Sequence, residues 1–144
     1  MEHSFLPQQQ LFPPFPITSH WRFEDLQIWQ EGAELAVRFH RVAQRLNRLG
    51  CHRYAEQLRA AGLSVPNNIA EGSASPHWKE FVRFLSIARS SLFENSSMIL
   101  VFQKMDLLEQ SEVDELMRRQ DLLSRKISVF IRSRKAKDAA SKSS

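Results

Sequence analysis

The chain has little of what covalent cross-linking or membrane insertion requires. Its 144 residues include a single cysteine, Cys51, which excludes an intrachain disulfide and fits a reducing compartment. No apolar run approaches the roughly 20 residues that a membrane-spanning helix needs. The beginning of the sequence lacks a basic segment followed by an apolar one, which is the pattern of a secretory signal. These absences predict a cytoplasmic protein.

Residues that build reactive sites are also scarce. There are only four glycines, and they form no glycine-rich phosphate loop. The five histidines are scattered, and the sequence has neither an HExxH pair nor an ExxH motif repeated on two helices. We therefore expect no catalytic residues, no metal and no cofactor, and we expect that the chain is not an enzyme.

Proline is concentrated at the beginning of the chain. Residues 1–19 hold four of the six prolines and three glutamines, and proline disfavours helix. We interpret residues 1–21 as a flexible, proline-rich arm. A docking segment is the alternative, because the arm also carries five large apolar side chains, namely Phe5, Leu6, Leu11, Phe12 and Phe15.

Apolar residues at helical spacing are what the chain has in quantity. They recur at steps of three, four and seven over about 25–49, about 54–71, from about 76 or 77 to 102, and from Ser111, a good N-cap, to about 130. No strand-like alternation and no internal repeat accompany them. Four amphipathic helices with short links predict an all-α, antiparallel, up-down-up-down four-helix bundle over residues 22–134.

The second helical segment contains a proline. Pro66 cannot donate to the carbonyl four residues back, so it should kink the helix, and nearby short polar side chains can satisfy the freed backbone. We predict that Asn68 is inward and hydrogen-bonded, and that Glu71 and Gly72 end the helix. This structural role is favoured over a ligand site.

Asn95 projects from the centre of the third apolar face. A buried amide must find hydrogen-bond partners, so Asn95 either sets helix register or oligomer specificity or is bonded to local water.

The first helical segment carries a row of arginines. Four of them share one arc, turned away from the apolar face: Arg38, Arg41, Arg45 and Arg48. Only Glu34 lies one turn upstream of a member of this row. Arginine forks match phosphate geometry, so the row is either a nucleic-acid-binding surface or an ordinary solvated face.

The end of the chain is basic as well. From residue 132 onward there are five cations and one acid, in a chain whose net charge is +4. Further candidates for nucleic-acid binding are Arg132, Arg134 and Lys135, provided that the end of the last helix lies close to the arginine row. We predict that residues 135–144 form a disordered basic tail.

Three ordered motifs resemble those of a known family. FEDLQIWQ (23–30), SVPNNIAEG (64–72) and KEFVRFLSIARSSLFE (79–94) are similar, in order and spacing, to motifs of the four-helix-bundle proteins encoded by intervening sequences in bacterial large-subunit ribosomal RNA genes. The usual family forms are FxDLxVWQ, S(V/I)PxNIAEG and KEFxRFLxxAxGSxxE, and the resemblance covers roughly residues 22–130. Asn68 and Glu71 match the family residues, whereas Asn95 stands where the family usually has leucine.

The resemblance implies a four-helix protomer, a homopentamer and no known enzymatic activity. The same fold is used by the accessory variability proteins of diversity-generating retroelements, which form pentameric barrels and bind reverse transcriptase and nucleic acid. We therefore expect a non-enzymatic oligomeric adaptor that binds RNA, DNA or a nucleic-acid enzyme such as a reverse transcriptase. The alternative is a structural or protein-interaction module without nucleic-acid binding.

Overall fold

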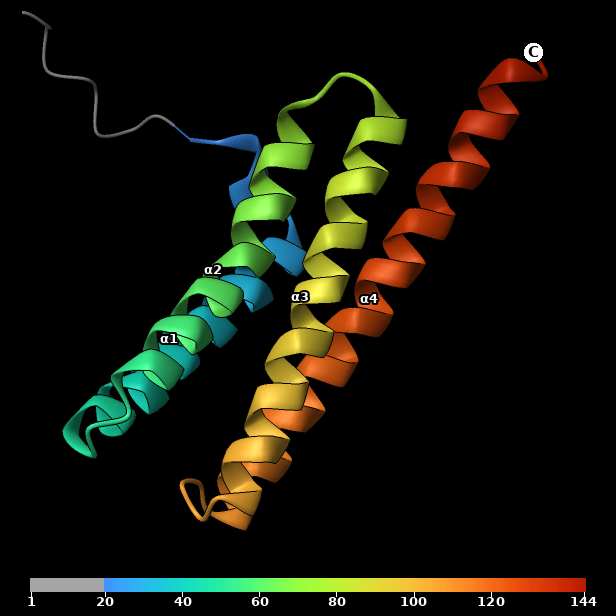
Figure 1. Cartoon of the computed structure of the whole chain (residues 1–144). Coiled ribbons are helices and arrows are strands. Elements are labelled where there is room, and N and C mark those ends of the chain that lie inside the picture. The colour runs from blue at the N-terminus through green and yellow to red at the C-terminus, as the bar shows by residue number, and fades with distance from the viewer. Residues whose placement is uncertain (1–19) are drawn as a thin grey trace, which may run out of the picture.

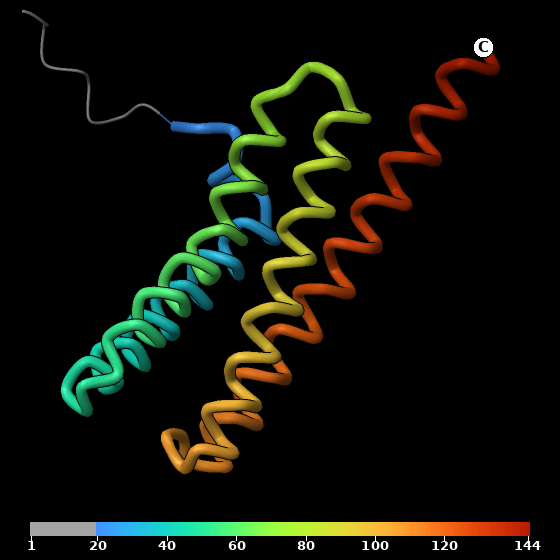
Figure 2. Tube along the Cα trace, in the orientation of Figure 1, coloured from blue at the N-terminus to red at the C-terminus, as the bar shows by residue number. Residues whose placement is uncertain are grey.

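The computed structural model describes residues 20–144, and over this range it contains helices and no strand (Figure 1). A short 3-10 helix, η1 (Arg22–Asp25), precedes four α-helices: α1 (Gln27–Arg48), α2 (His52–Ala74), α3 (Trp78–Lys104) and α4 (Gln110–Lys142). Each α-helix runs antiparallel to the one before it, and Figure 2 shows the short turns that join them. The prediction of an all-α four-helix bundle is confirmed for this part of the chain. Residues 1–19, which make up most of the predicted arm, lie outside the described residues.

The core forms where the apolar stripes of the four helices meet. Leu35 and Phe39 of α1, Ile69 of α2, Ile99 of α3 and Ile127 of α4 are all buried in one cluster. Each large apolar side chain removed from water contributes about 1.5–3 kcal/mol, so this shared interior stabilises helices that would be marginal alone. Among the described residues, no helix is both long and apolar enough to cross a membrane.

The helices are arranged as a ring of neighbours. α2 packs on α1 and on α3, α3 packs on α4, and a smaller contact between α1 and α4 closes the ring. Phe81 near the start of α3 meets Phe130 of α4 edge to face, with ring centroids 5.5 Å apart. This contact aligns the start of α3 with a point about two thirds of the way along α4. Beyond it, α4 continues past α3 and projects from the bundle (Figure 1).

Two glycines allow α2 to approach its neighbours closely. A Cβ atom at Gly32 of α1 would lie only 3.2 Å from a side-chain atom of α2. A Cβ atom at Gly72 would lie 2.7 Å from Cδ2 of Phe81, which is closer than packed carbon atoms come. Gly72 therefore serves the packing of α2 on α3. The prediction that α2 ends at residues 71–72 is wrong, because the helix continues to Ala74.

The start of α4 differs from its prediction. The sequence predicts an N-cap at Ser111, but the helix begins at Gln110 and its N-cap residue is Glu109. Leu108 is buried immediately before this point. Because that side chain is anchored in the core, the chain turns into the helix earlier than the capping pattern indicates.

The end of α4 differs as well. Residues 135–144, for which the sequence predicts a disordered tail, are helical as far as Lys142. This stretch contains three alanines and neither glycine nor proline, so its helix propensity is high. An ion pair of 2.7 Å between Asp138 and Lys142, one turn apart, adds to it. The basic residues are therefore carried on a helix that continues directly from the bundle.

Candidate functional site

The segment around Pro66 lies inside α2. Pro66 is buried, and α2 is helical on both sides of it. Because proline has no N–H, the carbonyl of Gly62 lacks its usual donor within the helix. The bend that we predict at this point stays a prediction.

Ser64 is the centre of a small hydrogen-bonded cluster between α2 and α3. The Asn68 side-chain amide donates to the Ser64 carbonyl at 2.7 Å and to the Ser64 hydroxyl at 3.0 Å. The Ser91 hydroxyl of α3 donates to the Ser64 hydroxyl at 2.8 Å. Asn68 is half-buried and Ser91 is buried. Sequence reasoning missed Ser91, although its place on the inner face of the third helical pattern was available as a signal.

Asn95 lies deeper in the same interface. Its side chain is fully buried, and its amide nitrogen donates to the Ala61 carbonyl of α2 at 3.3 Å. Its side-chain oxygen has no hydrogen-bond partner among residues 20–144. Half of this buried amide is therefore unsatisfied, which costs stability unless another group supplies a donor. Glu71, the other family-matching residue, is exposed on α2.

Gln120 is a second buried amide, and the sequence analysis missed it. It lies on the inner side of α4, and its side-chain oxygen has no partner within the described part of the chain. It lines a hollow of about 260 Å³ between α3 and α4, beside the exposed ring of Phe93. Its position four residues after Leu116, on the apolar stripe, was the available signal.

Tertiary contacts divide the arginine row. Arg38 is half-buried and pairs with Glu34 at 3.1 Å on its own helix. Arg45 donates to Glu112 of α4 at 2.6 Å, a partner 67 positions away. Arg41 and Arg48 are exposed, and neither has an ion pair among the residues that the structure describes.

Acidic residues lie at the same end of the bundle as the row. The α1–α2 turn and the α3–α4 turn share this end (Figure 1), and the second turn and the start of α4 carry five acids: Asp106, Glu109, Glu112, Asp114 and Glu115. Glu115 pairs with Arg118 and Arg119, each at 2.6 Å. These hydrogen bonds, from Arg118 first, lower the pKa of the Glu115 carboxyl to about 2. The other four acids offset the positive potential of the row locally.

The other basic candidates lie at the opposite end of α4. Arg132, Arg134 and Lys135 are exposed, and the Arg134 guanidinium rests 5.1 Å from the centre of the Phe130 ring. Arg132 follows Glu112 by 20 positions, which is about 30 Å along a helix. Because Glu112 is bonded to Arg45, the structure does not bring the two basic groups together, and they form separate surfaces.

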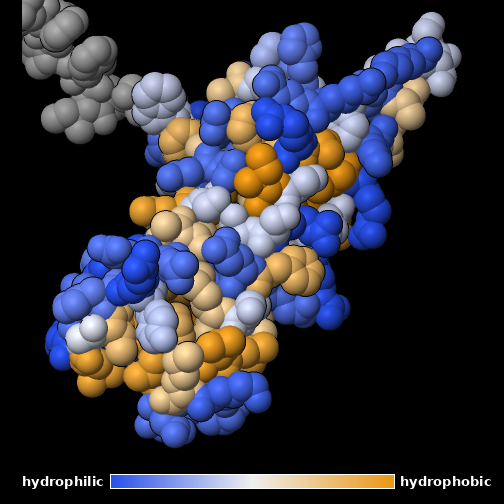
Figure 3. Space-filling model, viewed as in Figure 1, coloured by the Kyte–Doolittle hydropathy of each residue, from blue (hydrophilic) through white to orange (hydrophobic). Residues whose placement is uncertain are grey.

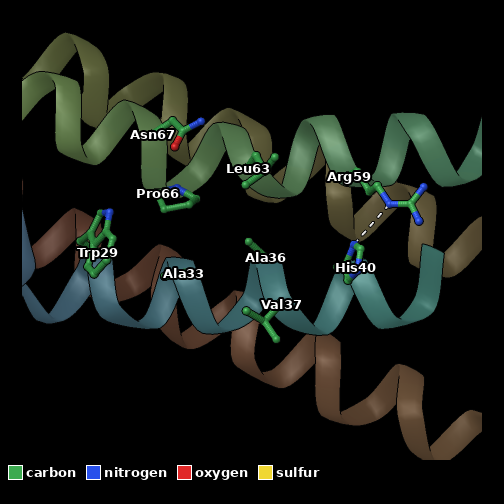
Figure 4. A pocket seen from close by; sticks show the side chains of 9 residues that line it. All are labelled: Trp29, Ala33, Ala36, Val37, His40, Arg59, Leu63, Pro66 and Asn67. Atoms are coloured by element: carbon green, nitrogen blue, oxygen red, sulfur yellow. Dashed lines mark hydrogen bonds between the residues drawn. The ribbon is translucent and has the colours of Figure 1, made fainter. Parts of the chain in front are cut away.

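A groove of about 370 Å³ runs along the outer side of α1 and α2. Figure 4 shows its lining, which comes from both helices: Trp29, Ala33, Ala36, Val37 and His40 of α1, and Arg59, Leu63, Pro66 and Asn67 of α2. At one end, the Arg59 side chain donates to His40 at 3.4 Å. The sequence analysis missed this groove, because it depends on how two helices face each other. The small Ala33 and Ala36 next to the apolar stripe were its only signal.

The geometry defines a small basic four-helix protein with separate cationic surfaces. No group of three or more potential metal ligands comes together within residues 20–144. The family model described as "23S rRNA-intervening sequence protein" matches residues 24–129, and the chain belongs to this family.

A solved structure has the same fold. It is a protein of unknown function from the S23 ribosomal protein family of Bacteroides thetaiotaomicron, which superposes with a TM-score of 0.69 at 17% sequence identity. The match covers 72% of this chain and 97% of that protein. A comparison with curated proteins finds no match.

Proposed function

We propose that the chain is a non-enzymatic, oligomeric adaptor that binds nucleic acid, alone or together with a nucleic-acid enzyme such as a reverse transcriptase. The projecting end of α4 carries this proposal. Five cations and one acid lie between residue 132 and the end of the chain, on helical turns that extend beyond α3 (Figure 1). A basic helix free of the bundle can lie along a phosphate backbone, where counterion release favours binding.

The arginine row is the weaker of the two cationic surfaces. Two of its four members are paired with acids, which leaves Arg41 and Arg48 to contact phosphate. Neither surface contains a motif that reads base edges, so binding should depend little on sequence. RNA and DNA are both expected to bind.

The proposed assembly is a homopentamer. It is supported by the resemblance to the pentameric accessory variability proteins and by large apolar side chains that the single chain leaves exposed on α3 and α4, namely Phe93, Leu100, Val101, Leu122 and Val129. Figure 3 shows hydrophobic surface in several places along one face of the bundle. Light scattering should return the mass of five copies of the 16.8 kDa chain. A monomer mass at micromolar concentrations would contradict this assembly.

Two charge-reversal variants test nucleic-acid binding. Arg132→Glu with Lys135→Glu changes the α4 end, and Arg41→Glu with Arg48→Glu makes the same change in charge on the row. We expect the first variant to lose more affinity for a generic duplex at low salt. The slope of log affinity against log salt should become shallower by about 0.9 for each phosphate contact removed. Parent-like binding by the α4 variant, or no binding by the parent, would contradict the proposal.

A protein-interaction module without nucleic-acid binding is the second candidate function. The groove between α1 and α2 favours it, because its lining is mostly apolar and it is open to a partner. Apolar docking changes little with salt, whereas phosphate contacts weaken steeply as salt rises. Salt dependence of partner binding therefore separates the two candidates.

A further inference from the structure

The groove between α1 and α2 has the dimensions of a short extended peptide. Between Trp29 and His40 it follows 11 positions of α1, or about 16 Å of helix. Val37 and Leu63 flank it from opposite helices, and both are about half exposed, at 47% and 52%. Two apolar side chains held at this exposure along one groove leave a surface that an apolar segment can cover.

Three aromatic side chains in successive contact connect the start of the described chain with this groove. The Trp21 ring stacks on Phe23 with centroids 6.4 Å apart, and Phe23 packs against Trp29 at 4.9 Å. Trp29 in turn lines one end of the groove (Figure 4). The Arg22 side chain donates to the Ser73 carbonyl near the end of α2 at 3.0 Å. This hydrogen bond holds η1, at the start of the described chain, against α2, one of the two helices that form the groove. The described chain therefore begins next to one end of the groove.

We propose that the groove binds residues 11–16 of the same chain, the sequence LFPPFP. Six residues in polyproline II conformation span about 19 Å, close to the length of the groove. The segment ends only four positions before His20, so the connection is short. Among the residues that precede the bundle, this segment combines the most prolines with Leu11, Phe12 and Phe15, the side chains suited to an apolar groove.

The lining of the groove has the chemistry that proline-rich segments recognise. Such segments bind to grooves that contain aromatic side chains, and their carbonyl oxygens accept hydrogen bonds because proline leaves them without partners in the segment. The Trp29 indole N–H and the exposed Asn67 amide donate to no protein group within residues 20–144, so both are free to donate to those carbonyls. Aromatic and proline rings would cover Val37 and Leu63.

A free second copy is the weaker occupant on physical grounds. A segment tethered by four residues reaches its own groove at an effective concentration in the millimolar range, above that of any free copy at micromolar concentration. The polyproline conformation also loses little entropy on binding.

The test measures how accessible the groove is in the full chain. In a Cys51→Ser background, Leu63→Cys places a thiol at the edge of the groove, and Ile87→Cys places one on α3, where the side chain is 38% exposed and lines no part of the groove. Each cysteine variant is prepared in two forms, one with the native arm and one with the arm substitutions Phe12→Ser and Phe15→Ser. The rate of reaction with a maleimide is measured for both forms. We expect the arm variant to raise the labelling rate at position 63 about tenfold, the factor for a segment whose dissociation constant is about a tenth of a millimolar effective concentration. The rate at position 87 should not change.

Equal labelling rates at position 63 with both arms would overturn the proposal. The arm substitutions lie outside the bundle, so they leave its fold intact, and circular dichroism checks this. A disulfide between Phe15→Cys and Leu63→Cys, formed in the same Cys51→Ser background, identifies which chain supplies the segment. An intrachain product supports the proposal, and an interchain product overturns it in favour of a second copy.

Discussion

The Arg45 guanidinium of α1 donates to both carboxylate oxygens of Glu112 at the start of α4. The pair joins the first helix to the last across 67 positions, and both side chains are partly exposed. It removes Arg45 from the free cations of the arginine row. Because of this pair, reversing the charge of Arg45 would change the stability of the fold as well as the charge of the row.

Arg45→Glu should lower the free energy of unfolding, because it places a carboxylate against Glu112. Exposed pairs contribute about 0.2–1 kcal/mol, so loss of the pair together with the new repulsion should cost on the order of 1 kcal/mol. Urea unfolding measures the change. Arg41→Glu, without a partner to lose among the described residues, is the control and should stay within about 0.5 kcal/mol of the parent. Glu112→Arg added to Arg45→Glu should restore stability, and failure to do so would show that the pair does not form.

Asn68→Leu should lower the free energy of unfolding by about 1 kcal/mol, the value of a typical hydrogen bond. The substitution removes the donor to Ser64, whose hydroxyl then keeps only its bond from Ser91. Gln57→Leu, at an exposed amide of the same helix that lies outside the groove, is the control and should have little effect. Thermal melting distinguishes the two. Equal melting temperatures for the Asn68 variant and the parent would mean that the cluster contributes nothing.

Asn95→Leu should raise the free energy of unfolding by about 1 kcal/mol, because it replaces a buried, half-satisfied amide with an apolar side chain. Leucine is also what the family usually has at this position. Asn95→Ala should have the opposite effect, because it leaves a cavity. Denaturant unfolding of both variants provides the comparison. A clear loss of stability in the leucine variant would show that the Asn95 side-chain oxygen is satisfied in solution.

Glu115 should stabilise the fold at neutral pH and continue to do so under mildly acidic conditions. Its pKa is lowered from 4.5 to about 2 by hydrogen bonds from Arg118 and Arg119. A carboxyl whose pKa is depressed on folding adds stability above its unfolded pKa, and this contribution disappears as pH falls through the folded value. The difference in melting temperature between the parent and Glu115→Gln should therefore shrink progressively below pH 4.5, remain measurable at pH 3 and nearly vanish near pH 2.

The control for this experiment is Glu94→Gln, at an exposed site on α3. It should show little difference from the parent at either pH. Loss of the Glu115 difference already near pH 4.5 would show that the two arginines do not hold the carboxylate in solution. High salt should reduce the difference, because the group is exposed and its interactions are screened.

The helices and the family were predictable because both depend on residues that are close together in the sequence. The recurrence of Leu35, Phe39, Val42 and Leu46 predicts a helix with one buried face, and all four side chains are buried. The three family motifs predicted the membership that the family model shows. The end of α2 was predicted wrongly because glycine near a helix end can either end the helix or allow a neighbouring helix to pack closely. Gly72 does the second, because the side chain of Phe81 of α3 packs against it.

By itself, the sequence determined that this chain forms four amphipathic helices, because helical periodicity and short links are properties of neighbouring residues. Only the tertiary structure decided which charges remain free and where a groove opens. Arg45 is paired because α4 returns along α1, and Arg132 lies far from the arginine row because the same helix runs away from it. The groove exists because Ala33 and Ala36 face Pro66 across two helices, and such a relationship depends on how helices dock rather than on the order of residues within either one.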